Sequence, residues 1–318
     1  MTKYNFIDAD TLVVQSTVIE QYNYTVYDKD GTRIGPAKSK KDWQKENKDK
    51  NIDDYEFRSE AVLKQGRLAP LSRAVATFKK KVAKIQAKYP DHICVVCIEG
   101  EGNYRDDLYP AYKGHRDGEI LLREDLNKWI EKNWDKDKLI VAEGNETDDE
   151  IAMRMWKAHR IHEQTGEWPW IISSCDKDLR TVAGKIYNYC KDKEEIITVL
   201  EADRWFCIQL LIGDKVDNIK GLNARLPKEF LKPRGIRAVS GKVGEGTATK
   251  LLEECQTSKE CFQVVVDCYK EIYGDQWLQY LQEEALALRM CHTRAETQSG
   301  SHYKIINHLK HLGVETEE

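Results

Sequence analysis

Apolar, strand-like runs alternate with helical segments along residues 1–200 of this 318-residue chain, and acidic residues follow the runs. The run "HICVVCI" at 92–98 is almost wholly apolar, as is typical of a central strand with both faces buried. Before it, apolar residues recur every three or four positions from Leu68 to Ile85, which predicts an amphipathic helix. This alternation predicts an α/β fold whose central, mostly parallel sheet is flanked by helices.

Strands are expected at 4–7, 93–98, 138–143, 169–174 and 185–190. Further helices are expected at 120–134, 148–162 and 259–292, followed by a tail at 293–318. The segment "DKDG" (28–31) lacks the later ligand positions of a calcium loop, so we expect a hairpin turn there.

Carboxylates gather where the expected strands end. They are Asp8, Asp10, Glu99, Glu101, Glu143, Glu146, Asp148, Asp149, Asp176 and Asp178, with Asp214 and Asp217 further on. Each could be a helix N-cap on its own. In a parallel sheet, however, the carboxyl ends of the strands share one edge, where ligand sites form. Converging carboxylates repel unless cations neutralise them, and oxygen-rich sites select Mg²⁺ or Mn²⁺. The recurrence therefore favours a metal site.

Charged residues make up 33% of the chain and hydrophobic residues 41%, which indicates a globular protein. No apolar run is long enough for a membrane helix, and the N-terminus lacks a signal-peptide core, so we expect a cytoplasmic protein. In that compartment cysteines stay reduced and behave as small apolar residues. This is expected of Cys94, Cys97, Cys175, Cys190 and Cys207.

The formal net charge of −4 conceals two basic segments. Residues 64–88 contain eight Lys or Arg and no acid, and residues 220–250 contain eight against two acids. Taken alone, either segment could equally well be a solvated helix face or a basic binding face. Together, basic faces around an acidic pocket are compatible with a nuclease.

Four motifs, in this order, resemble the signature blocks of the flap endonuclease and 5′-nuclease superfamily, most closely those of bacteriophage-encoded 5′→3′ exonucleases. They are "NYRDDLYPAYKGHR" (103–116), "EGNETDDEIA" (143–152), "SSCDKDLRTV" (173–182) and "IGDKVDNIKGL" (212–222). The resemblance runs from residue 4 to about 255 and loosens over 20–60 and in the tail. It implies a PIN-like nuclease core at 1–200 with a helical arch at about 100–145, a helix–three-turn–helix region at 201–292, and the tail.

The resemblance also implies two bound ions, Mg²⁺ or Mn²⁺. The family's first-site carboxylates map onto Asp8, Glu146, Asp148 and Asp176, and its second-site carboxylates onto Asp149, Asp178, Asp214 and Asp217. The family's usual Asp after the strand at 93–98 is replaced here by Glu99 or Glu101, of which Glu99 is preferred. Asp10 has no counterpart in the family pattern.

Basic and aromatic residues complete the site that the resemblance implies. Lys113 and Arg116 correspond to a basic pair over the scissile phosphate, supported by Arg105, and Tyr104 would stack on an unpaired base. The glycine hairpin in 241–252 would bind duplex phosphates together with K⁺. The expected DNA-binding residues are Tyr104, Arg105, Lys215 of "IGDKVDNIKGL", and Gly244, Gly246, Thr247 and Lys250 of this hairpin. A dinucleotide loop is disfavoured there, because no strand precedes it and a third glycine is missing.

The implied activity is metal-dependent hydrolysis from a 5′ end, as a 5′→3′ exonuclease or flap endonuclease with RNase H-type activity. The partner would be DNA or an RNA–DNA hybrid, the products 5′-phosphomonoesters, and the setting primer removal in phage DNA replication. We expect a monomer in the host cytoplasm that does not bind membranes. Two alternatives stay open: a catalytically silent DNA-binding subunit on the same fold, and a PIN-like ribonuclease. The full set of carboxylates favours an enzyme, and the glycine hairpin favours the flap endonuclease branch.

Overall fold

The computed structural model describes most of the chain, and its contacts divide the chain into two compact units. The described residues are 2–17, 22–37, 39–62, 70–109, 112–113, 122–237, 241–298 and 300–316. Unit 1 comprises Met1–Thr11, Ile85–Gly118 and Asp135–Glu318, and unit 2 comprises Leu12–Lys84 and Glu119–Trp134. Two helices, α1 (Asp10–Thr17) and α3 (Pro70–Lys88), run across this division of the sequence. The predicted boundaries near residues 200 and 292 remain a prediction.

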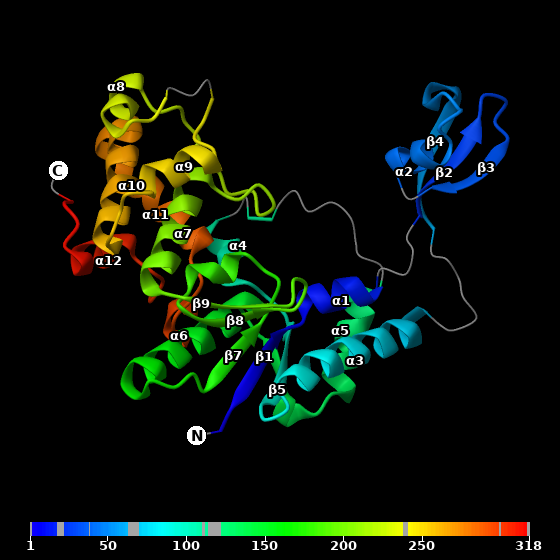
Figure 1. The fold of residues 1–318 in the computed structure, drawn as a ribbon, viewed down its shortest axis with the longest axis horizontal. Helices are drawn as coiled ribbons and strands as arrows, with labels where there is room; N and C mark the ends of the chain where they lie inside the picture. The colour runs from blue at the N-terminus through cyan, green and yellow to red at the C-terminus, as the bar shows by residue number, and fades with distance from the viewer. Residues whose placement is uncertain are drawn as a thin grey trace. The chain divides into compact units, whose positions relative to one another are not determined.

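Unit 1 is built on a six-stranded sheet with the order β6-β5-β1-β7-β8-β9 among the described residues (Figure 1). The strands are β1 (Tyr4–Asp8), β5 (Ile93–Glu99), β6 (Leu139–Ala142), β7 (Trp170–Ser173), β8 (Gly184–Asn188) and β9 (Lys193–Ile197). Neighbouring strands pair in parallel from β6 to β8, and β9 alone pairs antiparallel, with β8. The predicted mixed α/β fold with a mostly parallel sheet is confirmed.

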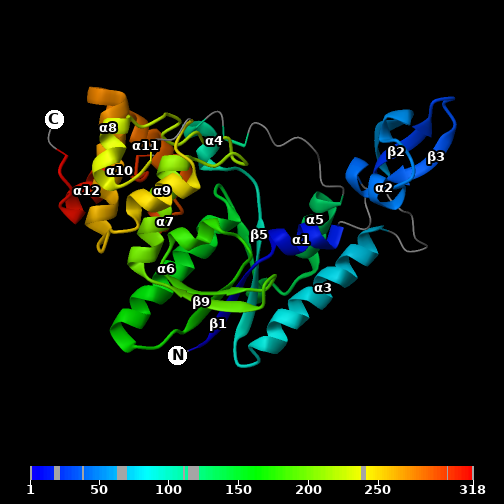
Figure 2. The same cartoon turned by 45° about the horizontal axis from the view of Figure 1, so that its top comes forward.

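Helix α6 (Thr147–Thr165) lies along this sheet and contacts β1, β5, β7 and β8 (Figures 1 and 2). Its first turn is fixed by a capping box between Glu146 and Asp149, and it ends at Gly166, whose φ of 75° suits glycine. Ile151 and Met155, four residues apart, are fully buried in one apolar cluster with residues of β1, β5, β7 and β8. This packing fixes the start of α6 relative to the ends of the strands.

The chain after β9 is largely helical, as predicted. Its helices are α7 (Val199–Ile212), α8 (Lys228–Leu231), α9 (Glu245–Leu252), α10 (Ser258–Tyr273), α11 (Trp277–Leu288) and α12 (Ile305–Leu312). They enclose a second apolar cluster that includes the fully buried Phe262 and Leu210. The short helix α4 (Tyr104–Leu108) contacts α11. The helical region is therefore packed around a core of its own within unit 1.

Unit 2 contains a three-stranded antiparallel sheet with the order β3-β2-β4. Its elements are β2 (Tyr22–Asp28), β3 (Arg33–Ala37), β4 (Tyr55–Val62), α2 (Lys40–Glu46) and, further along the chain, α5 (Arg123–Asn133). The hairpin turn predicted at "DKDG" joins β2 to β3 and is confirmed. Trp43 packs its ring against Tyr55 and Phe57 to form a small core.

The prediction that Cys175 and Cys190 remain separate reduced thiols is wrong, because the two form a disulfide with Cα atoms 5.9 Å apart. Each cysteine follows the end of its strand by two residues, Cys175 after β7 and Cys190 after β8, and these strands are parallel neighbours. Cys94, Cys97 and Cys207 are free and buried, as expected.

None of the described helices is long and apolar enough to cross a membrane.

Candidate functional site

The carboxyl edge of the parallel sheet brings predicted ligands together. Asp8 is the last residue of β1, Asp148 lies in the first turn of α6 after β6, and Asp176 follows β7. Ser174 links two of them, because its hydroxyl donates to Oδ2 of Asp8 (2.6 Å) and accepts from the backbone N–H of Asp176 (2.9 Å). The edge position inferred from strand ends is thus present in the structure.

Electrostatic repulsion marks the centre of this group. Burial raises the pKa of Asp148 well above its usual value, and the carboxylates of Asp8, Asp176, Glu146 and Asp10 raise it further. Four neighbouring acids therefore act on one carboxyl group. Such an arrangement favours binding of a cation or a proton.

A second group of carboxylates adjoins the first and shares Asp176 with it. Burial raises the pKa of Asp178 to about 7, and Asp176, Asp214 and Asp217 contribute to the rise while Lys177 opposes it. Asp178 begins the short 3-10 helix η3 (Asp178–Thr181). The predicted ligands from "SSCDKDLRTV" and "IGDKVDNIKGL" therefore lie in one electrostatic neighbourhood.

The loop that carries Asp214 is closed tightly on itself. Backbone hydrogen bonds join Asp214 and Ile219 in both directions, at 2.9 and 2.7 Å. Gly213 and Gly221 lie at the ends of the loop with φ values of 71° and 64°, and an added Cβ on either would lie 2.3 Å from a backbone atom. The two glycines of "IGDKVDNIKGL" therefore permit the closed loop that presents Asp214 and Asp217.

Two side chains hold the acids of the second group. Lys177 donates to Oδ2 of Asp214 at 2.9 Å, and Gln209 of α7 donates to Oδ1 of Asp178 at 2.6 Å. Burial opposes ionisation of Asp214, but the hydrogen bond and charge of Lys177, together with backbone N–H groups of Val216 and Asp217, lower the pKa of Asp214. Asp178 and Asp214, close to one another, thus have pKa values shifted in opposite directions.

Lys113 and Tyr112 connect the two groups through Glu146. The ammonium of Lys113 donates to Oε1 of Glu146, and the hydroxyl of Tyr112 donates to Oε2 at 2.9 Å. Tyr112 also lies 3.3 Å from Oδ2 of Asp217, whose carbonyl accepts from the N–H of Lys113 at 2.9 Å. Lys113 adopts a left-handed backbone conformation with φ of 53°, which is uncommon for a residue with a side chain. Its ammonium therefore lies at the carboxylates, and its catalytic role remains a prediction.

Arg105 and Asp149 form a buried ion pair. The guanidinium donates to both carboxylate oxygens, at 2.6 and 2.9 Å, and also to the carbonyls of Ala287 and Arg289. The N–H of Cys291 donates to Asp149 at 3.0 Å. Although burial opposes ionisation, Arg105 lowers the pKa of Asp149. With 1% of its side chain exposed, Arg105 contacts the protein interior in this structure, so its predicted DNA contact requires rearrangement.

The alternative ligands Glu99 and Glu101 both lie at the carboxyl edge of β5. Glu99 is the last residue of that strand, and the carbonyl of Glu101 accepts from Gly144 at 2.8 Å. The choice between them remains a prediction.

The carboxylate groups fit divalent cations by chemistry, since hard ions prefer such oxygens. Within the part of the chain that the structure describes, however, no three His, Cys, Asp or Glu residues are placed to hold one ion. The acids therefore lie at one edge of the sheet, but no three of the described ones surround a single ion position.

The predicted DNA-binding residues after position 200 lie along α9, from Gly244 to Lys250, and in the 213–221 loop, where Lys215 directly follows Asp214. Gly244 precedes α9, and its carbonyl accepts from Thr247 at 3.0 Å. Gly244 and Gly246 face open space, and Lys215 and Lys250 are exposed. These positions are accessible, and their role remains a prediction.

Tyr104 is partly buried and already in contact with other side chains. Its ring stacks on His302 with centroids 5.5 Å apart, and its hydroxyl lies 3.2 Å from the Cys291 sulfur. In this structure the Tyr104 ring stacks on His302, so its predicted stacking on a base is not seen. Arg116, the second member of the predicted basic pair, lies outside the described residues.

Several residues that organise the site were not singled out from the sequence. Ser174, Lys177 and Tyr112 position Asp8, Asp214 and Glu146, and Gln209 of α7 holds Asp178. The first three belong to the quoted motifs, so their place beside the acids was an available signal. Gln209 lies outside every motif, and its part in the site depends on the packing of α7.

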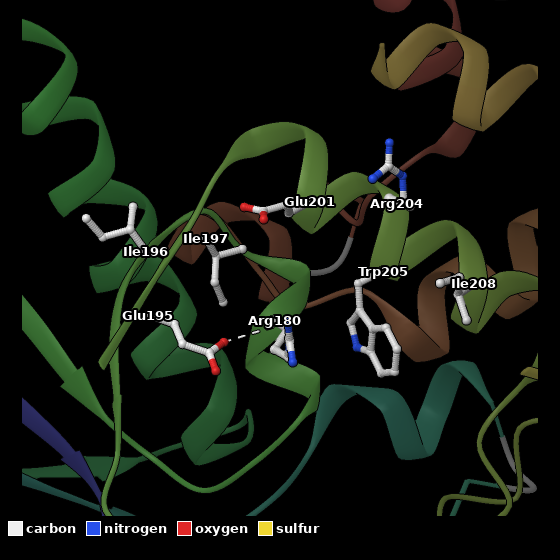
Figure 3. A pocket seen from close by; sticks show the side chains of 8 residues that line it. All are labelled: Arg180, Glu195, Ile196, Ile197, Glu201, Arg204, Trp205 and Ile208. Atoms are coloured by element: carbon white, nitrogen blue, oxygen red, sulfur yellow. Dashed lines mark ion pairs between the residues drawn. The ribbon is translucent and has the colours of Figure 1, made fainter. Parts of the chain in front are cut away.

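A cavity of about 190 Å³ lies beside η3, between β9 and α7 (Figure 3). Arg180 lines it near the ring of Trp205 and forms an ion pair with Glu195 at 3.7 Å, the dashed line in Figure 3. None of the residues predicted for the site lines this cavity. The carboxylate edge, rather than this cavity, is therefore the candidate site.

No family model matches the chain. DNA polymerase I of Rhizobium leguminosarum is 32% identical over 151 residues, which are 44% of this chain and 14% of that protein. This chain resembles the flap endonuclease and 5′-nuclease superfamily.

Among solved structures, the bacteriophage T5 D15 flap endonuclease in complex with DNA and metal ions is 14% identical, with a TM-score of 0.38. That match covers 67% of this chain and 90% of the other. T5 D15 protein co-crystallised with metal ions is 16% identical, with a TM-score of 0.36, covering 68% and 93%. At these TM-scores no residue role is transferred by superposition.

Proposed function

We propose that this chain is a metal-dependent 5′→3′ nuclease that hydrolyses phosphodiester bonds of DNA, or of an RNA–DNA hybrid, from a 5′ end. The observation that carries the proposal is the pair of carboxylate groups that share Asp176 at the carboxyl edge of the sheet. Repulsion within both groups supports a site for divalent ions. The matched segment of a DNA polymerase I supports nucleic acid as the substrate.

Two ions, Mg²⁺ or Mn²⁺, are proposed for this edge. Asp8, Glu146, Asp148 and Asp176 would hold one, and Asp149, Asp178, Asp214 and Asp217 the other, with Glu99 as a further ligand. When bound, such ions activate water and stabilise the leaving oxygen. Glu146 and Asp214 would exchange their present lysine partners for metal contacts. The acids need to converge for this, because no three of the described residues are placed around one ion.

The chain's own cations would act on the scissile phosphate. Lys113 is partly exposed at the carboxylates, so its ammonium can turn from Glu146 to a phosphate oxygen, where charge grows in the transition state. Arg116 would assist it, as the motif "YKGHR" implies. Tyr112 holds Glu146 from the opposite oxygen and is a positioning residue.

Duplex DNA is proposed to bind along α9 (Glu245–Leu252) and the residue before it, Gly244. Gly244 and Gly246 leave the backbone open to phosphates, Lys250 and Lys215 add positive charge, and K⁺ would bridge the hairpin to DNA. We propose a helix–three-turn–helix for this region, an arch at about 100–145, and action as a monomer in phage replication and primer removal.

A catalytically silent DNA-binding subunit is the second candidate. It is favoured by one observation: Arg105 and Lys113 already neutralise Asp149 and Glu146, as resident cations do in a site that binds no metal.

Cleavage of an end-labelled 5′-overhang duplex tests the proposal, with Mg²⁺ or EDTA present. We expect Mg²⁺-dependent release of short 5′-phosphorylated products and their loss in Asp176→Ala. Glu163→Ala, an exposed carboxylate on α6, is the matched control and should cleave normally. Binding of the duplex without cleavage in Mg²⁺ or Mn²⁺ would replace the nuclease with the silent subunit.

A further inference from the structure

The disulfide between Cys175 and Cys190 adjoins the predicted ligands directly. Cys175 precedes Asp176 in the chain, and Cys190 is exposed in the turn between β8 and β9. The N–H of Cys190 also lies 3.1 Å from the sulfur of Cys175. The bond therefore fastens the segment that carries Asp176 and Asp178 to a neighbouring turn of the sheet.

Hydrogen bonds carry this restraint into the carboxylate groups. The N–H of Asp178 donates to Oδ1 of Asp176 at 2.7 Å, and Ser174 joins Asp176 to Asp8. On the other side of the bond, Tyr189 donates to the carbonyl of Asp8 at 3.1 Å. Cys175 is thus flanked by Ser174, which contacts Asp8, and by the predicted ligand Asp176. Cys190 is preceded by Tyr189, which also contacts Asp8.

We propose that Cys175 and Cys190 form a reversible redox site that controls divalent-ion binding, with the bonded form weak in ion binding and the dithiol form strong. The inference rests on the proposed function. In the bonded form, no three of the described carboxylates are placed around one ion position. The bond also restrains the backbone beside Asp176. Opening it removes that restraint and lets Asp176 and Asp178 approach the other acids.

The chemistry is thiol–disulfide exchange with a small-molecule disulfide of the glutathione type. The thiolate of the exposed Cys190 attacks one sulfur of that disulfide, forming a mixed disulfide and releasing one small thiol. Cys175 then attacks the sulfur of Cys190 and releases the second small thiol. The two protein thiols lose two electrons and two protons, and the small disulfide gains both. Excess small thiol reverses the sequence.

The remaining seven cysteines are poorly suited to this exchange. All are buried, and burial raises the pKa of Cys94 to about 11 and of Cys268 to about 12, so the reactive thiolate is scarce. A redox response of this chain should therefore come from one pair.

The test equilibrates the full chain in a series of reduced and oxidised glutathione mixtures. Alkylation and mass spectrometry give the fraction of bonded pair, calorimetry gives the affinity for Mn²⁺, and the labelled duplex gives cleavage. We expect Mn²⁺ affinity and cleavage to rise about tenfold as the bond opens, the size of effect seen when groups supporting metal ligands are lost. Cys190→Ser should match the reduced wild type at every ratio, and Cys255→Ala, which keeps the pair, should respond like the wild type.

Equal Mn²⁺ affinity in the bonded and dithiol forms would overturn the inference, as would a pair that never bonds across the series. A redox-dependent Mn²⁺ affinity without cleavage in either form would support the redox site and overturn the proposed nuclease. Absence of both Mn²⁺ binding and cleavage in both forms would overturn both proposals.

Discussion

Neighbouring residues in one helical turn take opposite electrostatic roles at this site. The pKa of Asp148 is raised by burial and surrounding acids, whereas Arg105 and Cys291 together lower the pKa of Asp149 in spite of its burial. Successive helix positions point about 100° apart, so one carboxylate faces the acid groups and the other faces the guanidinium. Adjacent acids in one motif can therefore have pKa values shifted in opposite directions.

Arg105 is expected to contribute strongly to stability. Removing one partner of a buried ion pair leaves an unpaired charge, so Arg105→Ala should lower the free energy of unfolding by about 3–5 kcal/mol. Urea unfolding measures this. Arg160→Ala on the exposed face of α6 is the control, and an equal effect of both changes would contradict a structural role for Arg105.

Glu284 on α11 should make stability depend on pH. Burial raises its pKa from 4.5 to about 7, although Gly221 donates to its Oε2 at 2.9 Å. A raised carboxyl pKa means that charging costs more in the folded state, so the cost is absent below pH 4.5 and complete above pH 7. Glu284→Gln should therefore become more stable than wild type by about 3 kcal/mol as the pH rises through that window. A stability difference that stays constant with pH would contradict this.

Most of the acids could be predicted from the sequence because they follow strands, and strand ends in a parallel sheet share an edge. Asp214 and Asp217 follow helix α7 instead, and only the motif "IGDKVDNIKGL" indicated them. The partners of the acids could not be predicted. Gln209 reaches Asp178 only because α7 packs beside η3, and no local pattern encodes that contact. The disulfide was missed because strand adjacency, which brings Cys175 to Cys190, is a tertiary property.

At the scale of elements, the loop between Gly213 and Gly221 should tolerate no side chain at its ends. An alanine Cβ at Gly213 would lie 2.3 Å from the carbonyl oxygen of Ile219, at a φ of 71°. We expect Gly213→Ala to lower the free energy of unfolding by about 1–3 kcal/mol. Gly241→Ala, where the space is open, should change it by less than about 0.5 kcal/mol. Similar losses for both, in denaturant titrations, would contradict the strained loop.

Strand β9 and the unit 2 sheet show where element prediction failed. β9 reads "KEEII", and its charges hide the strand pattern while suiting an edge strand. No strand or helix was expected at 32–50, where lysine and other polar residues predominate, yet Arg33–Ala37 pairs with β2 and Trp43 anchors a small core. Central strands were predictable because burial on both faces makes them continuously apolar.

At the scale of the whole molecule, the carboxylate edge opposes folding when no cation is bound. Repulsion among acids is retained in a folded chain when function requires it, and it lowers stability in exchange for binding. A ligand that binds only the folded state raises stability by mass action. Bound Mg²⁺ should therefore raise the free energy of unfolding, whether or not the chain cleaves DNA.

The most direct test is the free energy of unfolding of the wild type and Asp148→Asn, each measured with EDTA and with Mg²⁺. We predict that Mg²⁺ at one hundred times its dissociation constant stabilises the wild type by about 2.7 kcal/mol. Asp148→Asn should be more stable than the wild type in EDTA, because one repelling charge is gone, and should gain less from Mg²⁺. A wild type whose stability does not respond to Mg²⁺, or a variant that gains equally, would contradict a divalent-ion site at this edge.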